Sequence, residues 1–392
     1  MNRIATTLLA LLLLFGGVFQ ARAADPFTAE QLVLMKLFGT DPITPSMFAP
    51  GFLSQVSMAQ VLEVFGRTRT TVGPPTGIEQ TGEGTYVVHT ASYDVPVNIG
   101  LDSAGRVAAL LIRPMSATFS SIGDVLSAIN GLGGDVGYLV TRDGAVLYAK
   151  GQLRPLAVSS GFKLGVLAAV NDAVKAGRLG WDSVLRLSAG EVSLPTGEIQ
   201  NLPVGSPITV ATLAAFMVSQ SDNTATDMLM DAVGRDKVAA KLGVPFVLRT
   251  SEFFKLKADP ALRLRFSGAD TAGQLKVAAD MASLPLPDAG NVVAPLDPGI
   301  EWYVSATRLC QMAQEVAGLD VFTINKGVAR PDQWQRIAFK GGSETGVASL
   351  TTALLDKAGH SFCVTLTQND HQALDEPRLT QLYAALVGKL AQ

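Results

Sequence analysis

The chain has 392 residues, of which 48% are hydrophobic and 17% are charged, so it can bury a large core and is not intrinsically disordered. Its 31 basic and 34 acidic side chains give a formal net charge of −3, without the basic excess typical of nucleic-acid-binding proteins. Two cysteines exclude a disulfide-rich scaffold and a four-cysteine zinc site, and three histidines without paired spacing disfavour a dinuclear metal hydrolase. We therefore expect two or three domains, with no metal, no other cofactor and no nucleic-acid partner.

The first residues have the pattern of a secretory signal peptide, residues 1–23. Arg3 supplies a positive charge, an apolar run covers 8–15, and the small residues Ala21 and Ala23 follow it. The run is short for a membrane span, and no cysteine follows it that could carry a lipoprotein anchor. We expect cleavage after residue 23, no transmembrane span afterwards, and a periplasmic or secreted location.

Residues 24–113 are predicted to form a small α+β accessory domain. Thr28 and Gln31 make a capping-box pattern before an apolar run, which predicts a helix ending at Gly39. The period of the hydrophobic residues then predicts a second helix and three strands. These elements are expected over 58–65, 84–90, 95–101 and 106–112.

A linker over 114–120 leads into the second predicted domain, residues 121–392. Its expected order is a helix, two strands, a series of helices, three strands and a terminal helix. Because strands at both ends enclose the helices, we predict one antiparallel sheet flanked by helices, with a helical subdomain inserted. The fold class of the whole chain is therefore α+β.

The two cysteines fall in different predicted elements of this domain. Cys310 lies in a helical pattern over 306–316, and Cys363 lies in a strand-like run over 362–366. Export permits a disulfide, but the spacing of two cysteines cannot establish one. We favour two buried free thiols.

The first segment that carries chemistry is Ser160-x-x-Lys163, at the start of an apolar helical pattern. Positions i and i+3 share one face of a helix, so the hydroxyl and the ammonium can meet. Backbone N–H groups at a helix N-terminus suit an oxyanion, and burial of Lys163 would lower its pKa toward that of a base. Alone the pattern is weak, because about one such match is expected by chance in a chain of this length.

Two further segments follow in the chain. The tripeptide 221–223, Ser-Asp-Asn, lies between helical patterns, where these residue types also make good N-caps. The segment 340–343, Lys-Gly-Gly-Ser, follows a strand-like stretch; it fits a glycine-rich hairpin with an exposed lysine, or an edge strand that lets a ligand approach closely. The chain has no Gly-x-Ser-x-Gly elbow and no phosphate-binding loop.

Taken together and in this order, the three segments resemble the motifs of class A β-lactamases and penicillin-binding proteins, over residues of about 121–392. The resemblance implies that Ser160 is the acylated nucleophile and Lys163 its proton acceptor. It implies that Ser221 relays a proton to the leaving group, that Asn223 holds Lys163 and the substrate amide, and that Lys340 attracts a substrate carboxylate.

The resemblance also implies an oxyanion hole of the Ser160 and Ser343 backbone N–H groups, with substrate contacts from Gly342, Ser343 and Thr345. Two departures stand out. The third motif lacks its usual hydroxyl at position 341, and the Glu-x-x-Leu-Asn loop that activates the deacylating water is missing. Glu252 is the nearest carboxylate and a candidate base for that step, although it is also an ordinary acid at the start of a helix.

The accessory domain is similar in architecture to that of the lipoprotein and clavulanate-cluster serine hydrolases, which join a cone-like α+β domain to a β-lactamase-like one. The leading functional expectation is an exported serine hydrolase of β-lactam amides, acting on small molecules, with slow deacylation. The alternatives are a cell-wall D-Ala peptidase, an esterase of small esters, and a non-catalytic penicillin-binding module.

Overall fold

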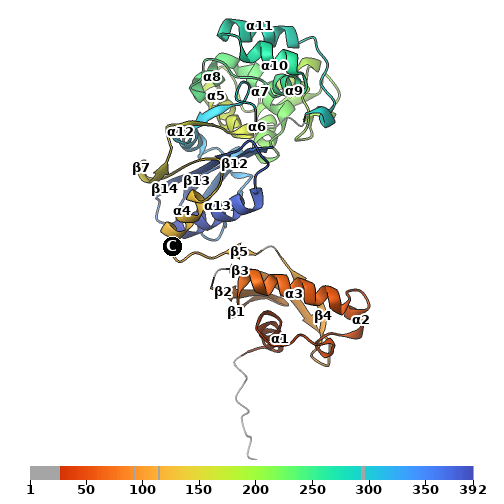
Figure 1. Cartoon of the computed structure of the whole chain (residues 1–392). Coiled ribbons are helices and arrows are strands. Elements are labelled where there is room, and N and C mark those ends of the chain that lie inside the picture. Colours follow the sequence, from red (N-terminus) through yellow and green to blue (C-terminus); the bar gives the residue numbers. More distant parts are fainter. Residues whose placement is uncertain (1–26, 92, 114, 293–295, 392) are drawn as a thin grey trace, which may run out of the picture. The chain divides into compact units, whose positions relative to one another are not determined.

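The computed structural model describes residues 27–91, 93–113, 115–292 and 296–391. The predicted signal peptide, 1–23, lies outside the described residues. The chain divides into two compact units, Met1–Ser116 and Ala117–Gln392, and the predicted linker 114–120 contains this division (Figure 1).

The first unit combines helices with an antiparallel sheet of order β1-β2-β3-β4. Its elements are α1 (Ala29–Phe38), α2 (Pro50–Leu53), α3 (Met58–Val72), β1 (Pro75–Gly82), β2 (Thr85–Thr90), β3 (Tyr93–Leu101) and β4 (Val107–Ile112); the two-residue strand β5 (Ser116–Ala117) lies at the division. Thr28 caps α1 and forms the predicted capping box with Gln31, and the helix ends before Gly39. Apolar side chains from α1, α3 and alternate positions of β2 and β3 form one core. The likeness of this unit to a cone-like accessory domain stays a prediction.

The second unit is built on an antiparallel sheet of order β12-β13-β14-β6-β7. Its strands are β6 (Asp135–Arg142), β7 (Ala145–Lys150), β12 (Arg336–Glu344), β13 (Val347–Leu355) and β14 (Ser361–Asn369). Strands from the beginning of the unit therefore pair with strands from its end, and the helices between them form the inserted subdomain. This confirms the predicted α+β class and the predicted sheet.

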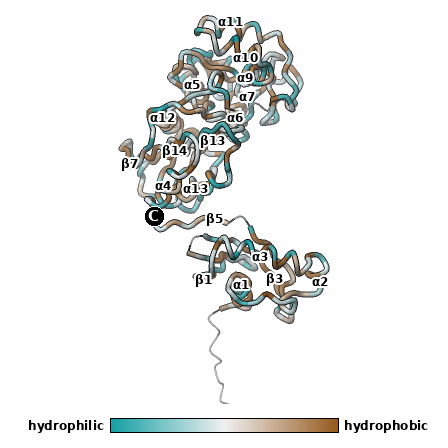
Figure 2. The backbone as a smooth tube through the Cα atoms, in the orientation of Figure 1, coloured by the Kyte–Doolittle hydropathy of each residue, from teal (hydrophilic) through white to brown (hydrophobic). Residues whose placement is uncertain are grey.

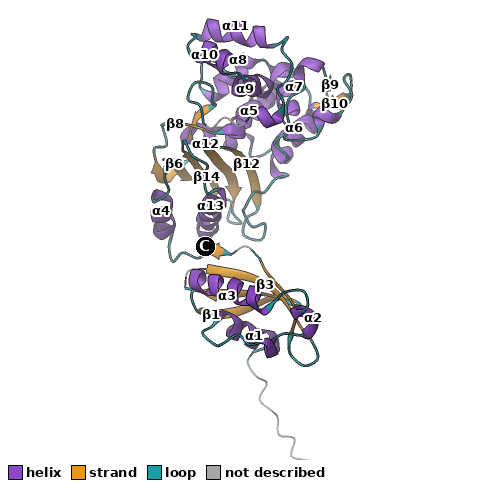
Figure 3. Ribbon diagram, turned by 45° about the vertical axis from the view of Figure 1, so that its right-hand side comes forward, coloured by secondary structure: helices purple, strands orange, loops and turns teal. Residues whose placement is uncertain are grey.

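Helices cover both faces of this sheet (Figure 3). On one face lie α4 (Ile122–Asn130) and α13 (Glu376–Leu390). The core on the other face contains residues from helices of the inserted subdomain: α5 (Lys163–Lys175), α6 (Val210–Ser219), α7 (Asn223–Val233), α8 (Arg235–Leu242), α9 (Thr250–Ala258), α10 (Pro260–Ser267), α11 (Thr271–Met281) and α12 (Ala306–Val316). The second unit also contains two short strand pairs. Strand β8 (Pro155–Ala157) pairs with β11 (Tyr303–Ser305), and β9 (Val184–Arg186) pairs with β10 (Pro207–Thr209).

Successive side chains of a strand point to opposite faces of the sheet, so one sheet contributes to two hydrophobic cores. On β14, Phe362, Val364 and Leu366 pack on the face with α4 and α13, whereas Cys363 packs on the opposite face. Both sides of the sheet are thus buried, which fits the nearly continuous apolar run of this strand. The described helices carry hydrophilic as well as hydrophobic residues (Figure 2), and within the described ranges none is long and apolar enough to span a membrane.

The structure corrects the expectation of two free thiols. Cys310 of α12 and Cys363 of β14 form a disulfide, with their Cα atoms 5.7 Å apart. The two predicted elements are as expected, but sequence spacing did not show that α12 packs on the face of β14 toward which Cys363 points. The bond ties a helix of the inserted subdomain to a central strand.

Replacing Cys310 and Cys363 by serine is expected to lower the free energy of unfolding by about 4 kcal/mol. The bond closes a segment with a sequence separation of 53 residues, and loop-closure entropy for such a length gives this magnitude. Urea denaturation of the oxidised protein, the reduced protein and the double variant would measure it. Equal unfolding midpoints for all three would contradict the prediction.

Candidate active site

Ser160 lies where a short 3₁₀ helix, η2 (Ser159–Phe162), passes directly into α5. The preceding residue, Ser159, has a left-handed backbone with φ +45°. Such a conformation costs a non-glycine residue roughly 1–2 kcal/mol, and it persists where the surrounding structure imposes it, often at functional sites. The fold therefore fixes the backbone at the predicted nucleophile.

Strand β12 approaches this backbone very closely. A Cβ atom at Gly342 would lie 2.6 Å from the Ser160 nitrogen and 2.4 Å from the Val158 oxygen, so only glycine fits there. The Ser159 hydroxyl donates to the Ser343 carbonyl oxygen at 3.1 Å. The two peptide segments predicted to supply the oxyanion hole, at Ser160 and Ser343, are thus packed against each other.

Lys163 is buried on the first turn of α5, with a side chain that reaches the 221–223 segment. Its Nζ donates to the carbonyl oxygen of Ser221 at 2.5 Å, to the hydroxyl of Ser221 at 3.1 Å and to Oδ1 of Asn223 at 2.6 Å. Burial, and then the positive charge of Lys340, holds the pKa of Lys163 well below its usual value. Among the described residues its Nζ makes no hydrogen bond to Ser160, a contact that in related chemistry often forms only with substrate bound.

The Ser-Asp-Asn tripeptide connects α6 to α7, and its three side chains serve two purposes. Asp222 is the N-cap of α7 and accepts from the Ala225 N–H at 2.8 Å, as the capping interpretation expected. Ser221 adopts a left-handed backbone with φ +59°, and Asn223 donates from Nδ2 to the Leu194 oxygen at 2.9 Å. The cap thus holds the turn that presents Ser221 and Asn223 to Lys163.

Lys340 extends from β12 to the same hydroxyl. Its Nζ lies 3.1 Å from Ser221 Oγ and donates to the Gly341 carbonyl oxygen at 2.5 Å. Lys340 is buried, so the expectation of an exposed lysine is wrong, although β12 and β13 do pair as a hairpin. Burial also lowers the pKa of Lys340 to about 7. Ser221 Oγ therefore lies between two buried lysines, each at 3.1 Å.

Two cavities, each of a little over 200 Å³, adjoin Ser160. One is also lined by Ser221, Gly342 and Ser343, and extends to the start of α13 at Glu376. The other is lined by residues of α9, by the end of β12 and by the predicted contact residue Thr345, which follows β12. The predicted nucleophile thus opens to space on both sides, and each predicted substrate-contact residue lines at least one of the two cavities.

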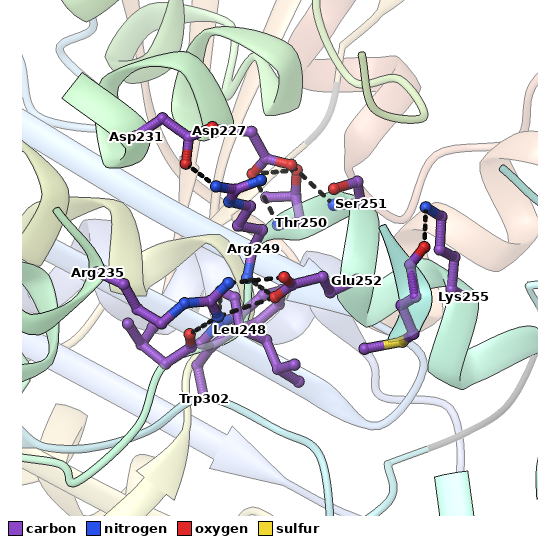
Figure 4. Close-up of polar contacts among 12 residues, drawn as sticks. Asp227, Asp231, Arg235, Leu248, Arg249, Thr250, Ser251, Glu252, Lys255 and Trp302 are labelled. Atoms are coloured by element: carbon purple, nitrogen blue, oxygen red, sulfur yellow. Dashed lines mark hydrogen bonds and ion pairs between the residues drawn. The ribbon is translucent and has the colours of Figure 1, made fainter. Parts of the chain in front are cut away.

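Glu252, the candidate deacylating base, is placed differently from the other predicted residues. It accepts from Arg235 at 2.6 Å and 2.9 Å, and from the Arg249 backbone N–H at 2.9 Å (Figure 4). It does not line either cavity beside Ser160. Its hydrogen bonds make it a structural acid at the start of α9, which was the ordinary interpretation of this residue.

Replacing Glu252 by glutamine is therefore expected to destabilise the fold by on the order of 1–3 kcal/mol, because the partly buried Arg235 guanidinium loses its bidentate partner. We expect little change in the rate of covalent labelling. Thermal denaturation and labelling kinetics would measure the two effects separately. Glu63→Gln, which breaks an exposed pair with Arg67, is the matched control and should change stability by less than about 1 kcal/mol.

Two polar residues that support the site, Asp227 and Thr196, were not predicted from the sequence. Asp227 of α7 is buried and accepts from Thr250 and Ser251, which holds the start of α9 beside the tripeptide. Thr196 donates to the Ser221 carbonyl oxygen at 2.6 Å and lines both cavities. Asp227 lies four residues after Asn223, one turn along the helix, which is a signal that could have been used. Within the described ranges, His, Cys, Asp and Glu form no group that could hold a metal ion.

Comparison with known proteins gives one family match, to the β-lactamase enzyme family over residues 120–284. One similar solved structure is a β-lactamase from Sphaerobacter thermophilus, which is 20% identical in sequence and has a TM-score of 0.49. The alignment covers 69% of this chain and 96% of that chain. PBP-A is also similar, with 16% identity, a TM-score of 0.48, and coverage of 69% of this chain and 94% of that chain. So is GNCA4, the class A β-lactamase of the last common ancestor of Gram-negative bacteria, with 17% identity, a TM-score of 0.48, and coverage of 69% of this chain and 99% of that chain. No curated protein sequence matches the chain. The family match lies within the second unit and covers its residues 120–284.

Proposed function

We propose that the protein is exported and hydrolyses β-lactam amides through an acyl-enzyme on Ser160. One observation carries the proposal: the hydroxyl of Ser221 lies 3.1 Å from Nζ of both Lys163 and Lys340, beside a serine that opens to two cavities. This arrangement offers a base, a proton relay and a cation next to one nucleophile, which are the groups that acyl transfer from a neutral serine requires. Export is supported by the signal-peptide pattern over 1–23.

In the proposed acylation, Ser160 Oγ attacks the lactam carbonyl carbon while its proton passes to unprotonated Lys163. The backbone N–H groups of Ser160 and Ser343 would stabilise the oxyanion. As the carbon–nitrogen bond breaks, Ser221 donates its proton to the leaving nitrogen and recovers one from Lys163. The lowered pKa of Lys163 supports this role, because a base has to be largely unprotonated at the working pH.

An esterase or a peptidase of the same mechanism is the second candidate, and one residue favours the esterase. Glu376, at the start of α13, lines the cavity that Ser221 also lines. A negative charge there opposes binding of a substrate carboxylate, which a small neutral ester does not carry. A penicillin-binding module without turnover remains the non-catalytic alternative.

The test is to measure steady-state turnover of a chromogenic cephalosporin, a simple aryl ester and a D-Ala-D-Ala peptide side by side. The β-lactam is expected to give the highest kcat/KM. Preference for the ester or the peptide would replace the leading proposal by the second candidate. Covalent labelling without turnover of any of the three would favour the binding module.

We expect a pre-steady-state burst of product, followed by slow turnover and an adduct that persists in intact-mass spectra. The groups for acylation are present, whereas Glu252, the nearest carboxylate in the sequence, is engaged by Arg235. Slow loss of the adduct is therefore expected to limit the steady state. Turnover of benzylpenicillin at roughly tens per second or faster, without a detectable adduct, would contradict this expectation.

A further inference from the structure

The face of β12 that meets the catalytic groups continues past them. Alternate residues of a strand point to the same side, so Lys340, Gly342 and Glu344 share one face. Lys340 contacts Ser221, and Gly342 packs on the backbone of Ser160. Glu344 is the next residue on that face, beyond Ser160 as seen from Lys340.

Glu344 opens onto the cavity that lies on this second side of Ser160. Ser160, Lys257 and Glu344 all line it, together with aromatic side chains of α9. Ser221 and Gly342, by contrast, line the cavity on the first side. The leaving-group side and the Glu344 side of the nucleophile are therefore distinct.

The carboxylate of Glu344 interacts with two buried side chains, Lys257 and Glu301. Its Oε2 lies 3.2 Å from Nζ of Lys257, and the same Nζ lies 2.6 Å from Oε1 of Glu301. Oε1 of Glu344 and Oε2 of Glu301 are buried and have no hydrogen-bond partner among the described residues. The neighbouring carboxyl is a donor for such an acceptor when one of the two groups is protonated.

The charges around Glu344 set its protonation. Burial, followed by the negative charge of Glu301, raises the pKa of Glu344 to about 8, while Lys257 acts in the opposite direction. Glu301 also accepts a hydrogen bond from the backbone N–H of Asp297, and the Asp297 side chain pairs with Arg263. Tyr303, two residues after Glu301, begins β11. The carboxylate is thus only partly ionised at neutral pH.

We propose that Glu344 accepts the proton of the water that hydrolyses the Ser160 acyl-enzyme. The inference rests on the proposed function, since it needs an acyl group on Ser160. Water forms a bond to the acyl carbonyl carbon and gives one proton to Glu344. The bond between that carbon and Ser160 Oγ then breaks, the proton returns to Oγ, and the acyl group leaves as a carboxylic acid.

Glu344 thereby takes the role that Glu252 cannot take, and it does so from a strand instead of from the α9 region. It lies directly after Ser343, one of the two predicted oxyanion donors. A water between Glu344 and Ser160 would approach the acyl carbon from the side opposite Ser221. Such separation places the attacking water away from Ser221, the group proposed to protonate the leaving nitrogen.

The experiment follows loss of a preformed adduct. Full-length protein is acylated at pH 7 with benzylpenicillin and, in parallel, with p-nitrophenyl acetate; the adduct on Ser160 is then followed by intact mass after transfer to pH 6, 7, 8 or 9. For the wild type, adduct loss should accelerate about tenfold between pH 7 and 9, as a base with pKa near 8 ionises. Glu344→Gln should acylate normally, lose its adduct about 100-fold more slowly at pH 9, and show a flat profile.

Glu301→Gln is the matched comparison, because it removes the negative charge beside Glu344 and keeps the Glu344 carboxyl itself. It should lower the pKa of Glu344, move the profile to lower pH and speed adduct loss at pH 7 by a few-fold. A purely structural role of the cluster would make both variants change in the same direction, and that result would overturn the proposal. If Glu344→Gln fails to fold, the test uses Glu301→Gln and the shorter acid Glu344→Asp instead. The pH at which adduct loss accelerates in each of these two variants then decides the role of Glu344.

The failures of the two proposals are distinguishable. An adduct that forms in every variant and is lost at equal rates from the wild type and Glu344→Gln would overturn the role of Glu344 alone. If neither acyl donor gives an adduct on Ser160 in the wild type, the proposed function fails and the role of Glu344 fails with it.

Discussion

Replacing Ser160 by alanine is expected to abolish covalent labelling by a penicillin and to reduce turnover by about 10³-fold or more, the scale on which loss of a serine nucleophile acts. The reason is local: Ser160 opens to both cavities, next to the backbone that Gly342 approaches. Intact-mass analysis after incubation with penicillin gives the readout. The alanine variant should keep the fold, because the side chain makes no described hydrogen bond that stabilises it.

The control is Ser283→Ala, which removes an exposed serine hydroxyl elsewhere in the same unit. It should label as the wild type does. Equal labelling of wild type and Ser160→Ala would mean that another residue carries the acyl group. The assignment of the nucleophile would then be wrong.

Lys163→Ala is expected to slow acylation about 100-fold or more, the usual scale for loss of a general base. Lys163→Arg should be no better, because a guanidinium stays protonated. In the wild type the pKa of Lys163 is held low by burial and by Lys340, so acylation should fall as the pH is lowered through that pKa and the amine becomes charged. Rates of adduct formation at several pH values would measure both effects.

Lys237→Arg is the control, since this lysine pairs on the surface with Asp236 and lies outside both cavities. Its acylation rate should equal that of the wild type. Normal acylation by Lys163→Arg would show that Lys163 has a structural role and that the proton goes elsewhere.

The proximity of the candidate site residues was predictable, because each of them lies in a short segment with its own local geometry. Lys163 is one helical turn from Ser160, and Ser221 and Asn223 flank the N-cap Asp222. The sheet was predictable because its strands are apolar runs bounded by turns. In the first unit β1 was missed. Pro75 and two glycines interrupt its pattern, and its pairing with β2 supplies what the local sequence lacks.

What the sequence could not show depends on contacts between distant elements. The disulfide requires α12 to lie on one particular face of β14. The structural role of Glu252 follows from its contact with Arg235, seventeen residues away in the chain. The environment of Glu344 is set by Lys257 and Glu301, which belong to other segments. In each case the residue type was visible, but its role depends on which side chain it meets after folding.

The sheet of the second unit also constrains the order in which the site can form. Asn369 of β14 donates to and accepts from the backbone of Ala157, 212 residues earlier. During synthesis from the N-terminus, the segment that carries Ser160 therefore emerges long before β12 and β14 exist to support it. Such long-range pairing slows folding, because the chain entropy of a large loop is lost before the contacts form. If Ser160 is acylated as proposed, a chain that ends before β12 lacks both Lys340 and Gly342 and is expected not to be acylated.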